Sequence, residues 1–187
     1  MLSSYNTNNL NYGDLLGCIT YLISPKNIVE FGILNGYSLD CFNKNTNGSC
    51  NIQAYDIFDD FNGNHANQNV LVETFCNFKN IKIEVGDFYN KYKEIQDNTI
   101  DILHIDIANT GDTYQFVFEN YINKISKNGI IIMEGGSEER DNVSWMTKYN
   151  KKKIKPIINK YNKEYNIKTI GTMPSITIIK LQLYAYF

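Results

Sequence analysis

The sequence predicts an α/β fold, in which a doubly wound sheet of about seven strands carries helices on both faces and has an antiparallel last strand. Three observations lead to this prediction. Apolar runs alternate with amphipathic stretches along the whole chain, which is typical of strands alternating with helices. Several apolar runs are almost continuous in Ile and Val, as expected for parallel strands that are buried on both faces. The chain closes with two adjacent strand-like segments, which indicate a β-hairpin.

Each element is predicted from its local pattern. The first helix is expected at 10–23, because apolar residues recur there at helical spacing until Ser24-Pro25. Strands are expected at 27–31, 51–56, 81–85, 99–105, 130–133, 167–170 and 175–183. The remaining helices are expected at 37–45, 66–78, 88–95, 112–125 and 153–165, with a loop at 58–64. Turns are expected at Asn47-Gly48, at Asn128-Gly129 and at 171–174.

The bulk composition predicts one domain over 1–187, with an N-terminal helical segment at 1–25 and an insertion with a helix at 136–165. Hydrophobic residues make up 43% of the chain and charged residues 20%, as in globular proteins. The net charge of −2 creates no field that favours nucleic acid or an anionic membrane. No apolar run reaches the roughly 18 residues of a membrane span. The polar start at 1–11 lacks the features of a signal peptide, so we expect a cytoplasmic protein.

The four cysteines are scattered through the chain, without a Cys-x-x-Cys pair or a nearby histidine. This spacing indicates neither a disulfide framework nor a zinc site, so free thiols are expected.

The most informative segment runs from Ile28 to Ser38, where an apolar run ends in an acid and two glycines follow four residues apart. A strand that turns sharply into a helix has this pattern, because glycine lets the backbone pass close to a ligand and the helix start presents free N–H groups. Glu30-x-Gly32-x-x-x-Gly36-x-Ser38 resembles the first motif of class I S-adenosylmethionine (SAM) dependent methyltransferases. The resemblance implies a Rossmann-like sheet of order 3-2-1-4-5-7-6, SAM as cofactor, and contacts to its methionine portion from this loop.

Acidic residues also follow the next strands, at the edge where open parallel sheets bind ligands. Asp56 ends the second strand 24 residues after Gly32, near the spacing of a ribose-binding acid, and is followed by Ile57. The resemblance places Asp87 where it reaches the adenine amino group, with Phe88 covering the ring. A single acid of this kind is equally consistent with a solvated loop, but their register with the glycine loop indicates a cofactor site.

A nicotinamide cofactor is the competing interpretation. It requires Gly-x-Gly-x-x-Gly, whereas this chain has only Gly32-x-x-x-Gly36. Acids around the site attract the sulfonium of SAM and repel a pyrophosphate, so we expect SAM.

The segment 103–114 (Leu-His-Ile-Asp-Ile-Ala-Asn-Thr-Gly-Asp-Thr-Tyr) resembles the fourth-strand motif of small O-methyltransferases, a group that includes sugar O-methyltransferases. The resemblance covers 26–183 and places Asp106 beside the transferring methyl group, as a cofactor contact and as the first candidate for the general base. His65 and His104 are the further candidates. His104 lies deeper on the same strand face, where a buried structural histidine is the simpler interpretation. His65 is in the loop after the second strand, in a better position for substrate.

Metal-dependent members of that group hold their cation with an acid on strand four and two further ligands at the end of strand five. Asp106 and Glu134 are two carboxylates available here for a hard cation such as Mg²⁺. Gly135 stands where another ligand is expected, so metal dependence is kept as an option. A strand-end acid capped by backbone N–H groups is the alternative interpretation of Glu134.

The segment after the fifth strand is expected to lie over the acceptor pocket. Arg140 is the only arginine, and all the other basic side chains among the 18 lysines and arginines are lysine. A guanidinium suits bidentate recognition of a carboxylate or phosphate, but an ion pair with a neighbouring acid of 138–141 is equally consistent. Trp145 is expected to stack on a sugar or ring, or to lie in the core of a helix. The candidate substrate contacts are therefore His65, Glu134, Arg140 and Trp145.

The function predicted from these features is methyl transfer from SAM to a hydroxyl of a small molecule, such as a sugar or glycan precursor. An N-methyltransferase and a catalytically silent SAM-binding protein share the same cofactor features and remain as alternatives, because fold alone does not fix the reaction. No nucleic acid or membrane partner is expected. The chain has no large inserted cap domain, so the acceptor pocket is either shallow or completed by a second subunit in a homodimer.

Overall fold

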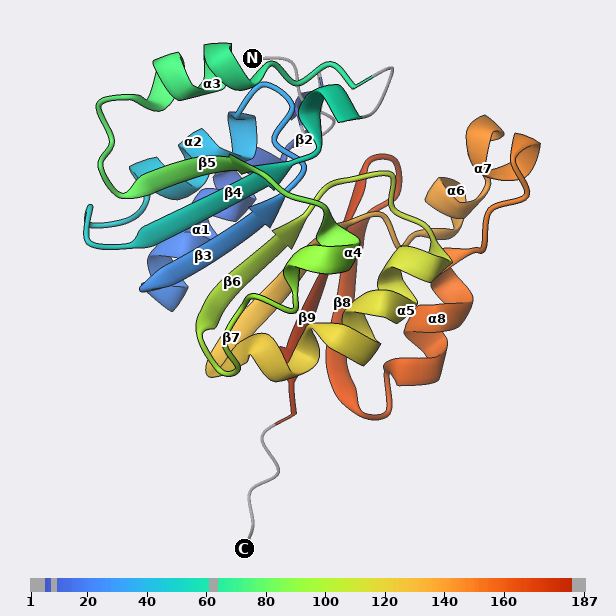
Figure 1. The fold of residues 1–187 in the computed structure, drawn as a ribbon. Coiled ribbons are helices and arrows are strands. Elements are labelled where there is room, and N and C mark those ends of the chain that lie inside the picture. Colours follow the sequence, from blue (N-terminus) through green and yellow to red (C-terminus); the bar gives the residue numbers. More distant parts are fainter. Residues whose placement is uncertain (1–5, 8–9, 61–63, 183–187) are drawn as a thin grey trace, which may run out of the picture.

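The structure, a computed structural model, describes residues 6–7, 10–60 and 64–182. Its centre is a seven-stranded sheet of order β5-β4-β3-β6-β7-β9-β8 (Figure 1). The strands of this sheet are β3 (Asn27–Phe31), β4 (Asn51–Asp56), β5 (Ile81–Val85), β6 (Ile100–Ile105), β7 (Ile125–Glu134), β8 (Tyr165–Gly171) and β9 (Ser175–Leu181). A separate antiparallel pair, β1 (Asn6–Thr7) and β2 (Leu10–Asn11), precedes them.

The first five strands of the sheet are parallel, and only the closing strand breaks this pattern. β3 pairs with β4 and β6, β4 with β5, and β6 with β7, all in parallel. β9 inserts between β7 and β8 and runs antiparallel to both. If the seven strands of this sheet are numbered 1 to 7 along the chain, so that β3 is strand 1, their order is 3-2-1-4-5-7-6. This confirms the predicted topology and the antiparallel last strand.

Helices cover both faces of the sheet (Figure 1). One face carries α1 (Tyr12–Ile23), α2 (Tyr37–Lys44) and α3 (Gln68–Phe75). The other face carries α4 (Phe88–Lys91), α5 (Gly111–Asn120) and α8 (Ile154–Tyr161). The short helical turns are η1 (Phe58–Asp60), η2 (Ile122–Lys124), α6 (Glu138–Asp141) and α7 (Ser144–Lys148). Within the described part of the chain, none of the helices has the length and apolar character to cross a membrane.

Successive residues of the central strands enter two different hydrophobic cores. Ile28 and Ile102 pack with α1, α2 and α3, whereas Val29 and Leu103 pack with α4, α5 and α8. All four side chains are buried, because a strand between two helical layers has no solvent-facing side. This explains why these strands appear in the sequence as continuous apolar runs instead of alternating ones.

The strand predictions match the structure closely, with one correction. β3, β4 and β5 have the predicted bounds. The turn expected at Asn128-Gly129 is wrong, because these residues lie inside β7, where the pairing with β6 shifts register between Ile100 and Ile102. A Cβ on Gly129 would lie 2.6 Å from the carbonyl oxygen of Ile100, so the glycine allows β7 to pass close to β6.

The helices are shorter than predicted. α1 begins at Tyr12, since the two preceding residues belong to β2. α3 begins after Asn67, whose side chain accepts a hydrogen bond from the N–H of Val70. α4 ends at Lys91, α5 at Asn120 and α8 at Tyr161. Parts of the predicted N-terminal segment, of the loop at 58–64 and of the last strand fall at 1–5, 8–9, 61–63 and 183, outside the described residues.

Candidate active site

The loop that follows β3 is shaped by two glycines in the left-handed region of the backbone. Gly32 has φ +88° and Gly36 has φ +77°. A Cβ on Gly32 would lie well under 3.0 Å from the carbonyl oxygen of Asp106, a distance that real Cβ atoms essentially never show. A Cβ on Gly36 would lie 2.7 Å from the ring of Phe75. The glycines therefore let the end of β3 pass close to the end of β6 and let α2 begin against α3.

Asp56, at the end of β4, connects this glycine loop to the loop after β4. Its Oδ2 accepts a hydrogen bond of 2.8 Å from the N–H of Ile33. Its Oδ1 accepts hydrogen bonds from the N–H of Phe58 at 3.1 Å and from the side-chain amide of Asn64 at 2.6 Å. The carboxylate is 8% exposed and sits at the point where the two loops meet. Asn64, which the sequence analysis did not single out, is thus part of the site.

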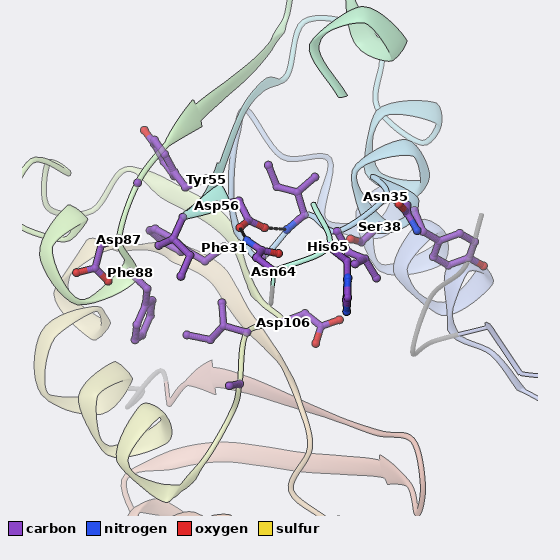
Figure 2. A pocket seen from close by; sticks show the side chains of 18 of the residues that line it. Phe31, Asn35, Ser38, Tyr55, Asp56, Asn64, His65, Asp87, Phe88 and Asp106 are labelled. Atoms are coloured by element: carbon purple, nitrogen blue, oxygen red, sulfur yellow. Dashed lines mark hydrogen bonds between the residues drawn. The ribbon is translucent and has the colours of Figure 1, made fainter. Parts of the chain in front are cut away.

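A cavity of about 540 Å³ opens at the carboxyl ends of β3, β4 and β6. Figure 2 shows Asp87 and Phe88 on one side of it, Asp56 and Asn64 in the middle, and Asn35, Ser38 and His65 on the other side. Its volume is within the range of pockets for small molecules and cofactors. The predicted cofactor residues that line it are Gly32, Ser38, Asp56, Ile57, Asp87, Phe88 and Asp106.

The far side of the cavity is built by the start of α4. Asp87 is the N-cap of this helix and accepts hydrogen bonds from the N–H of Tyr89 at 3.0 Å and from the side-chain amide of Asn90 at 2.6 Å. Phe88 is buried, with its ring stacked on Tyr121 at 5.0 Å and edge-on to Phe31 at 5.4 Å. The carboxylate of Asp87 is exposed beside this rigid aromatic wall.

Asp106 and His65 line the cavity from different elements (Figure 2). Asp106 directly follows β6, and its N–H donates a 2.9 Å hydrogen bond to the carbonyl of Phe31. His65 lies on the loop between β4 and α3 and is exposed. Of the three predicted bases, Asp106 and His65 are therefore accessible from the cavity.

Among the predicted cofactor residues and bases, Gly36, Glu30 and His104 do not line the cavity. Glu30 and His104 form a pair inside the sheet. Both are fully buried, and neither lines the cavity. Glu30 accepts a hydrogen bond from the hydroxyl of Ser38, and its Oε1 lies 2.9 Å from Nδ1 of His104. The two side chains pair in register on β3 and β6 and point toward the α1–α2 layer. The prediction that Glu30 lines the cofactor site directly is therefore corrected to a position behind Ser38, and His104 is a buried structural histidine.

The sequence comparison identifies the domain that carries this site. A sequence profile described as a methyltransferase domain matches residues 29–134, which is more than half of the chain. The chain belongs to this methyltransferase domain family. The match extends from β3 to the last residue of β7, so it contains the glycine loop, Asp56, Asp87 and Asp106. A search of curated proteins finds no match.

Solved structures share the fold of this methyltransferase domain. An O-methyltransferase from Bacillus cereus in complex with S-adenosylhomocysteine (SAH) has a TM-score of 0.70 at 16% identity, covering 97% of this chain and 84% of that chain. The O-methyltransferase TomG from Streptomyces achromogenes in complex with SAM has a TM-score of 0.68 at 12% identity, covering 91% and 79%. The SAH-bound methyltransferase PaMTH1 from Podospora anserina has a TM-score of 0.66 at 14% identity, covering 91% and 78%. At these identities the likeness shows the fold.

Glu134 and Arg140 form a buried pair beside the cavity of the methyltransferase domain, and the half-buried Trp145 lies against Arg140. Nε of Arg140 donates to Oε1 of Glu134 at 2.6 Å, and Nη2 donates to Oε2 at 2.9 Å. The guanidinium carbon lies 5.0 Å from the ring centre of Trp145. Arg140 is 5% exposed and Glu134 7% exposed, and none of the three residues lines the cavity. An ion pair of Arg140 is therefore present, but its partner is Glu134 and not an acid of 138–141.

These contacts correct two sets of predictions. Glu134, Arg140 and Trp145 are not exposed to an acceptor in the cavity, so the structure does not bring them to His65 as substrate contacts. The metal option also does not fit, because both carboxylate oxygens of Glu134 are occupied by Arg140. No cluster of three or more His, Cys, Asp or Glu side chains suited to a metal occurs among the described residues. Burial raises the pKa of the Glu134 carboxyl, and the hydrogen bonds from Arg140 oppose that shift.

Proposed function

We propose that this protein transfers a methyl group from SAM to a hydroxyl of a small-molecule acceptor. The observation that carries the proposal is the order of groups along one cavity of a methyltransferase domain. An acid beside an aromatic wall, a central acid, and a glycine loop at a helix start follow one another at the carboxyl ends of neighbouring strands. SAM is an elongated molecule with adenine, ribose and methionine portions in the same order.

Each part of the cavity suits one portion of SAM. The carboxylate of Asp87 can accept a hydrogen bond from the adenine amino group, while Phe88 supplies an apolar surface for the ring. Asp56, in the middle, suits the ribose hydroxyls and keeps the glycine loop in place through Ile33. The loop between Gly32 and Ser38 suits the methionine portion, with the carboxyl group of Glu30 directly behind Ser38. Solved methyltransferases of this fold contain SAM or SAH, which supports SAM as the ligand of this cavity.

Asp106 is our candidate for the general base. It follows β6 at the cavity, next to the glycine loop, because Gly32 allows the two strand ends to approach closely. Methyl transfer from SAM is an in-line displacement that depends on alignment and on removal of the proton from the acceptor hydroxyl. His65, on the exposed rim, is the second candidate. A sugar or glycan precursor as acceptor, a homodimer and a cytoplasmic location remain predictions.

Calorimetric titration with SAM, SAH and NAD tests the cofactor assignment. We expect SAM and SAH to bind, and NAD to bind roughly tenfold more weakly or not at all, a difference of about 1.4 kcal/mol or more. Asp87→Asn removes one charge but keeps a residue that caps helices well, so it should weaken both SAM and SAH without unfolding α4. Asp59→Asn is the matched control, because Asp59 is exposed and lies outside the cavity lining. Equal binding by both variants would contradict the placement of adenine.

Comparison of SAM with SAH tests the position of Asp106. SAM carries a positive sulfonium, and SAH has a neutral sulfur at the same place. If Asp106 lies beside the transferring methyl group, Asp106→Asn should weaken SAM more than SAH, since only SAM loses a charge interaction. A uniform loss for both ligands would place Asp106 away from the sulfur. Turnover that survives in Asp106→Asn would favour an N-methyltransferase, whose acceptor needs no strong base.

A further inference from the structure

Two acidic residues stand side by side where β6 and β7 end. Ile105 and Met133 are paired in register on these parallel strands, and Asp106 and Glu134 are the next residues of each chain segment. Neighbouring strands lie about 4.8 Å apart, so the two acids follow one another across the sheet edge. Two adjacent carboxylates repel each other and favour a cation between or beside them.

The chain supplies that cation from its own sequence. Arg140 binds both oxygens of Glu134 through a bidentate pair of hydrogen bonds, at 2.6 and 2.9 Å. Nη2 also donates to the carbonyl oxygen of Asn109 at 3.3 Å, and Trp145 covers the guanidinium. Asn109 comes directly after Ala108, which lines the cavity. The guanidinium is thus fixed next to the site but is shielded from solvent.

The local backbone is organised to return this arginine to the strand end. Gly135 and Gly136 have φ of +96° and +110°, which turns the chain back immediately after Glu134. Ser137 then caps α6, and its Oγ accepts a 3.0 Å hydrogen bond from the N–H of Arg140. Lysine provides every other basic side chain of this protein, yet lysine lacks the planar fork that matches a carboxylate. The single arginine therefore lies where bidentate geometry is needed.

We propose that Arg140 occupies the cation position at the ends of β6 and β7, and that it makes methyl transfer by this protein independent of divalent metal. This inference rests on the proposed function. The proposal also bears on the class of acceptor. An acceptor that is not held by a metal needs no pair of chelating oxygens. A single hydroxyl beside Asp106 is sufficient.

The chemical step between SAM and the acceptor then needs only protein side chains and no metal ion. The acceptor O–H bond breaks and its proton moves to the Asp106 carboxylate, while the acceptor oxygen forms a bond to the methyl carbon. The bond from sulfur to that carbon breaks, and its electron pair stays on sulfur, which leaves SAH and a methyl ether. The guanidinium of Arg140 keeps Glu134 paired throughout, so Glu134 neither repels the charged Asp106 nor competes for the proton.

Binding of Mn²⁺, followed by electron paramagnetic resonance on SAH-saturated protein, tests the proposal. The wild-type protein should show no saturable Mn²⁺ binding. Arg140→Met removes the guanidinium and should increase Mn²⁺ affinity by roughly tenfold or more. Lys153→Met is the matched control, because it removes one positive charge from an exposed side chain nearby and should behave like the wild type. Arg140→Gln, which removes the charge but keeps hydrogen-bond donors for Glu134, replaces Arg140→Met if that variant does not fold, and the same increase in Mn²⁺ affinity is expected.

The outcomes separate this inference from the proposed function. One saturable Mn²⁺ per wild-type chain, lost in Asp106→Asn and Glu134→Gln, would overturn the inference while SAH binding still supported the function. Equal Mn²⁺ affinity of Arg140→Met and Lys153→Met would also contradict it. Failure to bind SAH would sink the proposed function, and the same Mn²⁺ titration without SAH would still report whether Arg140 occupies the cation position. Trp145, the only tryptophan, gives a second signal: its emission should not respond to Mg²⁺ in the wild type.

Discussion

Substitution of Gly32 by alanine measures how strongly the close approach of β3 and β6 depends on a missing side chain. Gly32→Ala introduces two costs. The first is the positive φ of +88°, which costs an L-residue roughly 1–2 kcal/mol. The second is the clash of the new Cβ with the backbone oxygen of Asp106, which forces the ends of two strands apart. Overpacking of this kind costs about 1–3 kcal/mol, so the sum is about 2–5 kcal/mol.

Gly48→Ala is the matched control for the first cost. Gly48 has φ +76°, close to that of Gly32, but nothing lies within 4 Å of the position of its Cβ. It should therefore lose only about 1–2 kcal/mol of unfolding free energy, or roughly 2–8 °C in Tm. Gly32→Ala should lose roughly 4–20 °C. The difference between the two variants isolates the clash between β3 and β6.

Urea denaturation and SAH calorimetry on the same two variants complete the measurement. Gly32→Ala should weaken SAH by roughly tenfold or more, since it displaces the loop and Asp106 together. Gly48→Ala should bind SAH like the wild type, because the turn that contains it lies outside the cavity lining. Equal destabilisation and equal SAH affinity of the two variants would refute the argument that the glycine serves this strand contact.

Three further predictions concern buried or half-buried groups. Arg140→Met should destabilise the protein by about 3–5 kcal/mol, because it leaves the Glu134 carboxylate buried without its partner. The double variant Arg140→Met, Glu134→Met should recover most of that loss, as urea denaturation can measure. Burial raises the thiol pKa of Cys41 and Cys50 from 9.0 to about 11, so less thiolate is present near pH 8. Labelling of these thiols by iodoacetamide, followed by mass spectrometry, should therefore be roughly 100-fold slower than labelling of an ordinary thiol. The exposed comparison thiols are Cys18 and Cys76. Tyr114→Phe should cost about 1 kcal/mol in thermal unfolding, because it removes a buried 3.1 Å hydrogen bond to the carbonyl of Glu134.

The order of the elements could be predicted from the sequence because two-sided burial leaves a simple pattern. β3, β4 and β5 were predicted at their observed bounds, since short Ile- and Val-containing runs end in Gly, Asp or turn residues. The turn signal Asn128-Gly129 was misleading because glycine has a second use, close contact with a neighbouring strand. Residue type alone does not distinguish the two uses, which depend on the pairing of β7 with β6.

The sequence predicted which strand ends carry the residues of the site. It predicted less well in which direction their side chains point. Asp56, Asp87 and Asp106 line the cavity because each lies at, or just after, the carboxyl end of a parallel strand. Glu30 lies two residues before the register position of Asp56 and Asp106, inside β3 and level with His104, so its side chain is buried under α2 instead of facing the cavity. The sequence could not identify Glu134 as the partner of Arg140, because nearer acids competed and two glycines with positive φ direct the chain back.

A crystal structure of the wild-type protein with SAH tests the central claim most directly. It should place the adenine beside Asp87 and Phe88, the ribose hydroxyls at Asp56, and the homocysteine portion along the loop from Gly32 to Ser38, with the sulfur facing Asp106. SAH bound in the reverse direction, or outside this cavity, would contradict the assignment of these residues and the function derived from it.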